Sequence, residues 1–378
     1  MDNRIKVLHY TPGFDHGGIE SRLIDWYKNI DRNMVQFDLI KLTTADDNNQ
    51  LIRDFKDLGG KVFTLPQFSF ESIKPFMRGL RDFFEHNNDY DVIHCHSPLS
   101  GSFVLREAKK YNIPVRIMHS RTTQFDPGSK LLPIRKYLKN RSNKYATHFF
   151  ACSKEAGEWQ FGKKNVNDGN VKIIKNGIQS EKFIFNEEIR QKTRQALKLN
   201  KTFTIGHIGR FSSVKNHTFL IDVFKEITRR YEDSKLLLIG DGPEEFNIKQ
   251  KVRNLNIDDK VIFLGRQKEV ENYLHSMDVF IFPSIFEGFG TVAIEAQASG
   301  LECIVSKGVP FSVDVSNLIN HLPLSAGPEE WAEIILQFRE GYKRRNMYEV
   351  IVKAGFDAKY TAKLLESFYI SESESKRI

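Results

Sequence analysis

The chain has 378 residues, 40% hydrophobic and 28% charged, which is enough for two domains with packed cores. No stretch is long and apolar enough to span a bilayer, and the three scattered cysteines exclude a disulfide framework. The net charge of +8 lies within residues 1–180, which hold 28 Lys and Arg against 20 Asp and Glu, and no nucleic-acid-binding motif accompanies it. With no signal peptide before the first strand, we expect a cytoplasmic protein.

Short β-branched runs alternate with amphipathic helical stretches along the whole chain. The runs that predict strands are residues 4–10, 36–43, 61–66, 91–97, 115–120, 147–153, 171–177, 203–209, 235–241, 261–265, 278–284 and 301–306. Near-continuous apolar strands separated by helices indicate parallel sheets covered on both faces. Two such series, with a break near residues 176–188, predict an α/β chain of two Rossmann-like domains, residues 1–180 and 181–358.

Ligands of open parallel sheets bind beyond the carboxyl ends of the strands, so the loops there are the candidate sites. Gly17 and Gly18 follow the first strand and precede a helix, which would let a phosphate approach bare backbone N–H groups. The full dinucleotide fingerprint is absent, and a plain strand-to-helix turn explains the two glycines as well. This signal alone is weak.

The loop "GRFSSVKN" follows the strand at residues 203–209. Arg210 and Lys215 stand there as two cations at a strand end leading into a helix, which suits a diphosphate. A solvated basic loop is the alternative. Gly240, Gly242 and Gly265 repeat the strand–glycine pattern after the next strands, where most such glycines are turn residues.

The stretch "FPSIFEGFGTVAIEAQASG", residues 282–300, carries the most specific pattern. Glu287 lies in the predicted loop and Glu295 one turn inside the predicted helix, on the face of Thr291. The N–H groups near Gly290, Thr291 and Val292 begin that helix and can hold phosphate. Buried carboxylates are costly without partners, so we expect sugar hydroxyls as their donors, or else salt bridges to Arg or Lys within the fold.

Histidines at the ends of predicted strands are His94, His96 and His119. Strand alternation places His94 and His96 on one face and Cys95 on the other, but no third ligand is apparent, so we expect no metal. His119 is the better candidate for contact with a ligand. The "DYD" at residues 89–91 precedes its strand, on the wrong edge of the sheet for a cation site, and is expected to be structural.

The densest basic segment is residues 130–150, where six Lys and Arg residues stand among Leu, Ile and Tyr without an acid. A solvated helix face is one interpretation. The other is attraction to an anionic membrane surface.

Together these motifs resemble the GT-B glycosyltransferases, in particular the large retaining family 4. The Glu-x7-Glu of "EGFGTVAIE" is that family's signature, and "GGIE", "IIKNGI", "GRFSSVKN" and "IGDGP" stand in the family's order over essentially the whole chain. The segments "EAQASGLECIVSKGVP", "VDVSNLINHLPL" and "EEWAEIIL" are similar to members that build bacterial exopolysaccharide or capsule. Glu302 departs from the proline that relatives more often carry there.

The resemblance implies roles for individual residues. Glu287 would accept hydrogen bonds from the donor sugar and Glu295 from the ribose, while Arg210 and Lys215 neutralise the leaving diphosphate. His119 would contact the donor sugar near the reacting carbon. The remaining residues would contact phosphate or base: Gly18, Phe289, Gly290, Thr291 and Val292 the phosphates, and Arg266 and Gln267 the base. A final helix, residues 359–378, would pack back on the first domain.

The expected function is therefore the transfer of a sugar from a nucleotide sugar, expected to be a UDP-sugar, to a saccharide acceptor. The transfer is expected to retain the anomeric configuration and to need no metal. The acceptor is expected to be lipid-linked, with the protein peripheral at the inner face of the membrane and no resident cofactor. The alternatives are a GT-B nucleotide-sugar epimerase, which needs no acceptor, and a non-catalytic partner subunit, which would have lost the site residues. A sugar phosphorylase would need a lysine-bound pyridoxal site, for which the sequence has no motif.

Overall fold

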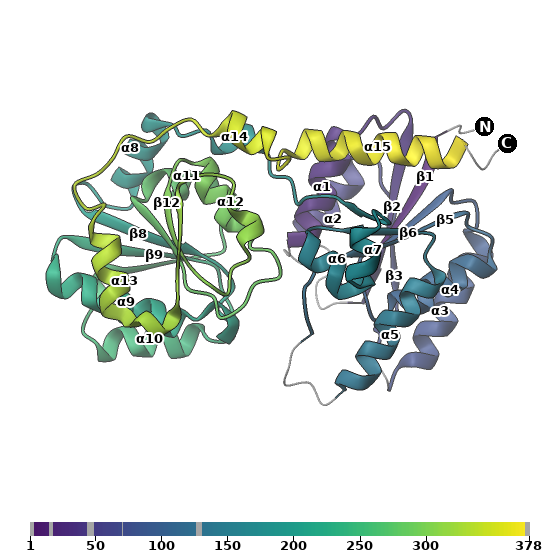
Figure 1. Cartoon of the computed structure of the whole chain (residues 1–378), viewed down its shortest axis with the longest axis horizontal. Helices are drawn as coiled ribbons and strands as arrows, with labels where there is room; N and C mark the ends of the chain where they lie inside the picture. Colours follow the sequence, from purple (N-terminus) through teal and green to yellow (C-terminus); the bar gives the residue numbers. More distant parts are fainter. Residues whose placement is uncertain (1–3, 15–17, 44–48, 70, 126–130, 375–378) are drawn as a thin grey trace. The chain divides into compact units, whose positions relative to one another are not determined.

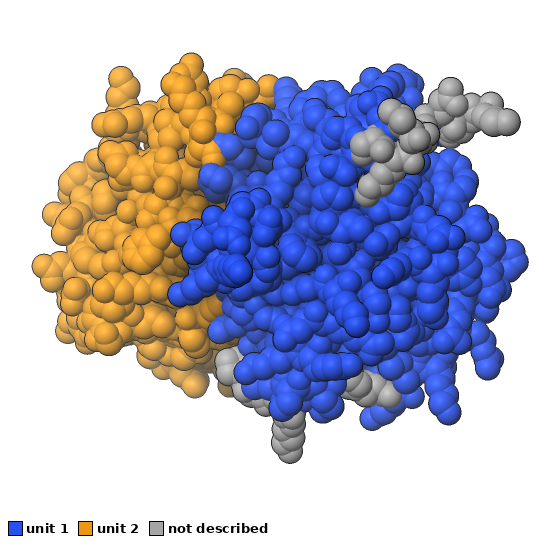
Figure 2. Space-filling model, turned by 45° about the vertical axis from the view of Figure 1, so that its right-hand side comes forward, with its two compact units in different colours: residues 1–179, 355–378 blue, residues 180–354 orange. Residues whose placement is uncertain are grey.

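The computed structural model of the chain describes residues 4–14, 18–43, 49–69, 71–125 and 131–374. The chain divides into two compact units, Met1–Gln179 with Gly355–Ile378 (unit 1) and Ser180–Ala354 (unit 2), which Figure 2 shows in separate colours. The sequence analysis placed these boundaries at residues 180/181 and 358/359.

Unit 1 is built on a seven-stranded sheet in the order β3-β2-β1-β4-β5-β6-β7, with every pairing parallel. The central strands β1, β2 and β4 are almost entirely buried, as expected for a sheet that is covered on both faces, whereas the edge strands β3 and β7 are partly exposed. Their bounds are β1 Ile5–Thr11, β2 Val35–Leu42, β3 Val62–Leu65, β4 Val92–Cys95, β5 Val115–Ser120, β6 His148–Ala151 and β7 Val171–Ile173.

Helices pack in two groups on this sheet, α1 with α2 and α15, and α4 with α3 and α5 (Figure 1). Polar caps begin several of them: the Asn49 side chain accepts from the Ile52 N–H at α2, and the Ser153 side chain accepts from Ala156 at α6. The helices are α1 Gly18–Asn29, α2 Gln50–Asp57, α3 Ile73–His86, α4 Gly101–Lys110, α5 Leu132–Tyr145, α6 Lys154–Phe161, α7 Lys163–Asn167 and α15 Ala358–Glu374.

The last helix, α15, belongs to unit 1 although it follows the whole of unit 2 in the chain. It lies along α1 (Figure 1), and its Leu365, Phe368 and Tyr369 join the core that contains Trp26 and Phe37. Helix α15 covers residues 359–374 of the helix predicted over 359–378, and residues 375–378 lie outside the described residues.

Unit 2 repeats the same topology with six parallel strands in the order β10-β9-β8-β11-β12-β13. Helices α9, α10 and α13 pack together, and α11 packs on α8 (Figure 1). The strands are β8 Phe203–Ile208, β9 Ser234–Ile239, β10 Val261–Gly265, β11 Val279–Phe282, β12 Glu302–Ser306 and β13 Ile319–Leu322. The α-helices are α8 Glu187–Ala196, α9 His217–Arg230, α10 Glu245–Asn254, α11 Val270–Ser276, α12 Thr291–Ala298, α13 Gly327–Leu336 and α14 Tyr348–Lys353, with short 3-10 turns η1 Ser180–Phe183, η2 Ser213–Lys215, η3 Asp258–Lys260, η4 Phe311–Val313 and η5 Leu324–Ala326.

The predicted α/β class with two parallel sheets is confirmed, and each of the twelve predicted strands is present. The thirteenth strand, β13, was not among the predicted strands. Its four residues, "INHL", are half polar and only partly buried, so they lack the apolar run by which the other strands were found. Edge strands of this kind are covered on fewer sides.

Candidate active site

The loops that follow β8 and β11 come together because these two strands are neighbours in the sheet of unit 2. The β8 loop ends in η2, which places Lys215 just before α9, and the β11 loop leads into α12. Lys215 Nζ lies 2.6 Å from Glu287 Oε1, with the side chains 21% and 10% exposed. The same ammonium group sits 4.7 Å from the centroid of the Phe282 ring. The structure therefore joins two residues that the sequence analysis placed in the site on separate grounds.

The carboxylate of Glu287 has a cationic partner within the fold. A salt bridge within the fold was the alternative to a sugar hydroxyl, and the partner is Lys215, itself a predicted ligand residue. The Glu287 N–H also donates to the carbonyl of Gly308, which holds the loop in place. A Cβ on Gly308 would come within 2.2 Å of the Ile285 carbonyl oxygen, so only glycine permits this close approach.

Helix α12 begins beside this ion pair. Its N-cap is Gly290 at φ 85°, with no side-chain cap, and Thr291 and Val292 are its partly exposed first residues. Uncapped first-turn N–H groups at the positive end of a helix favour an anion. Glu295 is partly buried one turn further on, and the buried Phe289 anchors the loop below. The predicted residues from Glu287 to Glu295 thus surround one helix terminus.

The other predicted cation of the β8 loop, Arg210, is exposed at the strand end. Its loop is held against the β9 loop by direct backbone packing: a Cβ on Gly240 would lie 2.1 Å from the Gly209 carbonyl oxygen, and one on Gly242 would lie 2.4 Å from that of Phe211. Both glycines have positive φ, 132° and 154°. They are turn residues, as the sequence analysis favoured, and they fix the position of Arg210.

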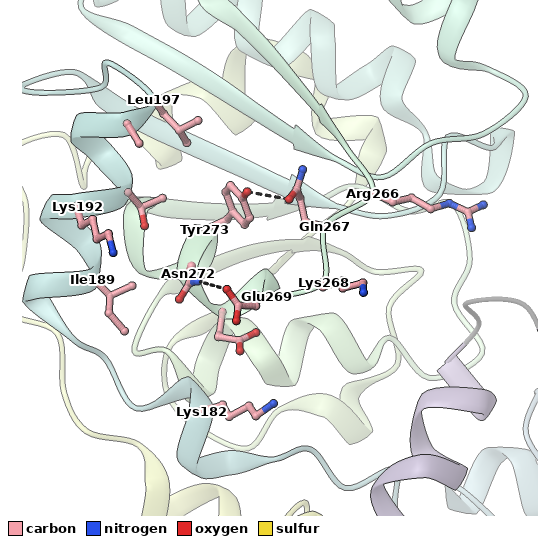
Figure 3. Close-up of a pocket in the computed structure, with 13 residues that line it drawn as sticks. Lys182, Ile189, Lys192, Leu197, Arg266, Gln267, Lys268, Glu269, Asn272 and Tyr273 are labelled. Atoms are coloured by element: carbon pink, nitrogen blue, oxygen red, sulfur yellow. Dashed lines mark hydrogen bonds between the residues drawn. The ribbon is translucent and has the colours of Figure 1, made fainter. Parts of the chain in front are cut away.

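Arg266 and Gln267 follow β10. Arg266 Nε pairs with Asp241 Oδ2 at 2.6 Å, whereas the Gln267 side chain is used internally: its amide donates to the Leu264 carbonyl at 2.6 Å and accepts from the Tyr273 hydroxyl at 2.8 Å. Figure 3 shows Gln267 turned toward Tyr273 and Arg266 extending away from them. A ligand at this loop would meet the Arg266 side chain more readily than the Gln267 amide.

A pocket of about 990 Å³ lies on the α8 side of the same loop (Figure 3). Its lining carries four cationic side chains against two acidic ones, and Arg210, Lys215, Glu287 and Glu295 do not line it. The pocket is therefore separate from the ion pair and helix terminus described above. Its lining comprises Lys182, Ile189, Lys192, Thr193, Ala196, Leu197, Arg266, Gln267, Lys268, Glu269, Glu271, Asn272 and Tyr273.

In unit 1, Gly18 is the first residue of α1, while Gly17 lies outside the described residues. His119, near the end of β5, is fully buried and accompanied by His94 and His96. The rings of His94 and His96 stack at 4.5 Å, which confirms that they share one face of their strand. Burial, reinforced by the positive charge of Arg121, holds the pKa values of all three histidines well below the usual range, so they are neutral.

The sequence analysis missed His9, which stands directly opposite His94 in the parallel pairing of β1 with β4. His9, His94 and His96 present ring nitrogens within 4.8 Å of one another, so a third side chain does accompany the pair. The sequence shows His9 within the first predicted strand, but the register that sets it opposite His94 comes only from the structure. However, these rings stack on each other, and His9 Nδ1 is hydrogen-bonded to His96 Nε2 at 3.2 Å. Arg121 Nε lies 3.4 Å from His96 Nδ1, an unfavourable neighbour for a cation.

The "DYD" motif is structural, as expected. Asp91 accepts from the Lys6 N–H, Asp89 pairs with the Lys6 ammonium group, and Tyr90 donates to Asp38. These contacts tie the start of β4 to β1 and β2.

The described basic side chains of residues 130–150 all lie on α5, whereas Lys130 lies outside the described residues and residues 146–150 lead into β6. Leu131, Ile134 and Tyr137 are 39%, 44% and 61% exposed on α5, beside the exposed Lys136. Lys139 is instead drawn inward, 4.8 Å from the Trp159 ring centroid, and burial lowers its pKa. The outward face of α5 therefore combines apolar and cationic side chains. Within the described part of the chain, no helix combines the length and apolarity that a bilayer crossing requires.

Comparison with known proteins bears on both units. Residues 16–182 match the family "Glycosyltransferase Family 4", and residues 188–354 match "Glycosyl transferases group 1". EpsF of Bacillus subtilis (strain 168), which is named as a glycosyltransferase, is 31% identical over 98% of this chain and 97% of its own length. The "Capsular polysaccharide biosynthesis glycosyltransferase CapH" of Staphylococcus aureus is 25% identical over 98% and 99%.

A third relative is "UDP-Gal:alpha-D-GlcNAc-diphosphoundecaprenol alpha-1,3-galactosyltransferase" of Escherichia coli, 28% identical over 57% of this chain and 58% of its own length. Among solved structures, Anabaena Alr3699/HepE, crystallised with UDP and glucose, superimposes with a TM-score of 0.72 at 18% identity, covering 99% of this chain and 98% of that one. At that identity the likeness concerns the fold. The full-length match to EpsF and the two family matches decide the rest: the chain belongs to glycosyltransferase family 4 and is a glycosyltransferase of the GT-B fold.

Proposed function

We propose that the chain transfers a sugar from a UDP-sugar to a saccharide acceptor in exopolysaccharide or capsule synthesis, with retention of configuration and without a metal. The observation that carries the proposal is the Lys215–Glu287 pair beside the uncapped start of α12. Lys215 suits a diphosphate and Glu287 suits sugar hydroxyls, and the helix terminus beside them suits phosphate. The role in polysaccharide synthesis is supported by the full-length similarity to CapH.

Glycosyl transfer requires charge stabilisation on the leaving diphosphate while the sugar becomes cationic. Lys215, the exposed Arg210 and the first N–H groups of α12 supply fixed positive charge there. Glu287 accepts hydrogen bonds from the donor sugar, and Glu295 accepts from the ribose. Losing one such preorganised donor costs about 3 kcal/mol in the transition state, or roughly 100-fold in rate.

Retention is proposed to follow from attack on the face that the diphosphate leaves, with the departing phosphate taking the proton of the acceptor hydroxyl. No side chain is assigned as a nucleophile. The anomeric coupling constant of the product measures the outcome, and an inverted product would refute this part. Full transfer in excess EDTA is expected because protein cations neutralise the diphosphate, whereas loss of activity that Mg²⁺ or Mn²⁺ restores would refute metal independence.

The acceptor is proposed to be lipid-linked. The E. coli relative's name specifies a diphosphoundecaprenol-linked acceptor, and the exposed Ile134 and Tyr137 beside Lys136 suit an anionic membrane surface. Sedimentation with anionic and neutral liposomes distinguishes the two interpretations of α5. Equal binding to both kinds of vesicle would refute the electrostatic attraction.

The donor is tested by thermal shift against a panel of nucleotide sugars, with UDP-sugars expected to stabilise the chain. Lys215→Ala and Glu287→Ala are expected to abolish transfer while the melting temperature stays near that of the wild type. Lys249→Ala is the matched control, because Lys249 also lies 2.6 Å from a carboxylate, Glu245, and near an aromatic ring. Unchanged activity in both site variants would refute the site.

A further inference from the structure

A chain of three hydrogen-bonded side chains runs through the core of unit 1. The Tyr369 hydroxyl lies 2.6 Å from His94 Nδ1, and His94 Nε2 lies 2.8 Å from His119 Nδ1. All three side chains are fully buried. Tyr369 belongs to α15, at the far end of the sequence, while His94 and His119 stand on the neighbouring strands β4 and β5.

The direction of the hydrogen bonds follows from the groups themselves. Burial raises the pKa of Tyr369 well above its usual value, so the phenol keeps its proton. That proton satisfies His94 Nδ1, whereas a hydroxyl that accepted from His94 would leave its own proton without an acceptor among the described residues. His94 is neutral, so its proton stands on Nε2 and is donated to His119 Nδ1. His119, also neutral, then carries its proton on Nε2.

The N–H at His119 Nε2 is the last donor of this hydrogen-bonded series. His119 Nε2 is buried and has no hydrogen-bond partner among the described residues, and an unsatisfied buried donor is costly. The ring is held in place by Trp26, which stacks on it at 6.1 Å, and by the edge contact with Phe150. The series of hydrogen bonds therefore ends in a fixed, neutral N–H donor that is suited to an oxygen acceptor.

A second chain beside it has the same direction. Arg121, which can only donate, contacts His96 Nδ1, and His96 Nε2 contacts His9 Nδ1, so the His9 proton also stands on Nε2. His9 Nε2 is likewise without a partner among the described residues. The two sets of hydrogen bonds thus assign the same tautomer to His9 and His119.

We propose that Tyr369 and His94 are positioning residues that fix His119 as a neutral Nε2–H donor to an oxygen of the substrate. The inference rests on the proposed function and adds to it the contact between His119 and the donor sugar that the family resemblance implies. In this tautomer His119 stabilises oxygen and does not remove a proton. The C-terminal helix thereby contributes to catalysis through a residue that touches no substrate.

The test is a double-mutant cycle measured as kcat for sugar transfer. Tyr369→Phe removes the hydroxyl, and with it the bias between tautomers, and is expected to lower kcat roughly fivefold, the fold-change of one neutral hydrogen bond. His119→Gln keeps an N–H near the Nε2 position but has no tautomers. In the His119→Gln background, Tyr369→Phe is therefore expected to have no further effect on kcat. The same fivefold loss in both backgrounds would overturn the proposal, because it would show that Tyr369 acts through packing alone.

Two controls complete the design. Tyr10→Phe removes an equally buried hydroxyl bond, to Ser100 at 2.7 Å, and is expected to lower the melting temperature as Tyr369→Phe does while leaving kcat unchanged. His119→Asn places its amide near the Nδ1 position instead and is expected to be less active than His119→Gln. Equal activity of the Asn and Gln variants would contradict the Nε2–H donor.

A measurement that needs no turnover separates this inference from the proposed function. In protein labelled with ¹⁵N-histidine, the His119 signals, assigned by their loss in His119→Gln, are expected to show a protonated Nε2 and an unprotonated Nδ1. Tyr369→Phe is expected to shift them toward a mixture of tautomers. A protonated Nδ1 in the wild type would overturn the inference, whereas failure of every nucleotide sugar to bind would overturn the proposed function.

Discussion

Glu287→Gln is the substitution that separates the two roles of the ion pair. In the structure Glu287 holds the Lys215 ammonium group at 2.6 Å, so a diphosphate that takes Lys215 must compete with this carboxylate. Glutamine preserves the size and one acceptor oxygen of the side chain but removes its charge. The substitution should therefore act in opposite directions on the binding of the nucleotide alone and on transfer of the sugar.

The magnitudes follow from the burial of the pair. Fully exposed pairs contribute 0.2–1 kcal/mol, and this pair, at 21% and 10% exposure, belongs at or above the upper end, about 1 kcal/mol. Releasing Lys215 from it should tighten UDP binding about fivefold, and removing the repulsion between carboxylate and phosphates acts in the same direction. The weaker contact to the donor sugar should lower kcat, by up to roughly 100-fold if the charged acceptor matters only in the transition state.

Isothermal titration with UDP and steady-state transfer assays measure the two effects on the same preparation. Glu245→Gln is the control, because it breaks a pair of the same 2.6 Å length with Lys249 outside the site and should change neither quantity. Weaker UDP binding by Glu287→Gln would show that the carboxylate and the diphosphate do not compete for Lys215. Unchanged transfer would remove Glu287 from the sugar site.

Three further outcomes are expected. Gly240→Ala should destabilise unit 2 by several kcal/mol, because its Cβ would lie 2.1 Å from a backbone oxygen at a φ of 132°; an unchanged melting temperature would contradict this packing. Burial lowers the pKa of His9 to about 3, against 6.5 in the unfolded chain. Stability is therefore full above pH 6.5, and below that pH the free energy of unfolding should fall by roughly 1.4 kcal/mol per pH unit for this histidine and for each similarly buried one. Urea unfolding at pH 7.5 and 5.5 measures this loss, and equal free energies of unfolding at the two pH values would refute it. Lys136→Glu should weaken binding to anionic liposomes by about 1 kcal/mol or more and leave binding to neutral liposomes unchanged, as measured by sedimentation. Unchanged binding to anionic liposomes would show that α5 is only a solvated face.

Much of the fold followed from the sequence because parallel strands covered on both faces must be continuously apolar. The stretch "VFIF" and its eleven counterparts were recognisable for this reason, whereas β13, half polar at the sheet edge, was not. The loop from Glu287 to Glu295 was equally legible, since a strand, a glycine turn and a helix start follow one another directly in the chain. Local patterns of this kind need no knowledge of what lies across the fold.

Contacts between distant segments depended on the tertiary structure. The order of strands in the sheet brings Lys215 to Glu287, and the amide of Gln267 turns out to be satisfied within its own loop. The hydrogen bond from Tyr369 to His94 joins residues 275 positions apart, and no periodicity in the sequence encodes it. By itself the sequence determined which residues stand at the ends of the strands, because a continuous apolar run is a local feature of the chain. Only the tertiary structure decided which of them touch, because that depends on strand order, register and the return of α15 to unit 1.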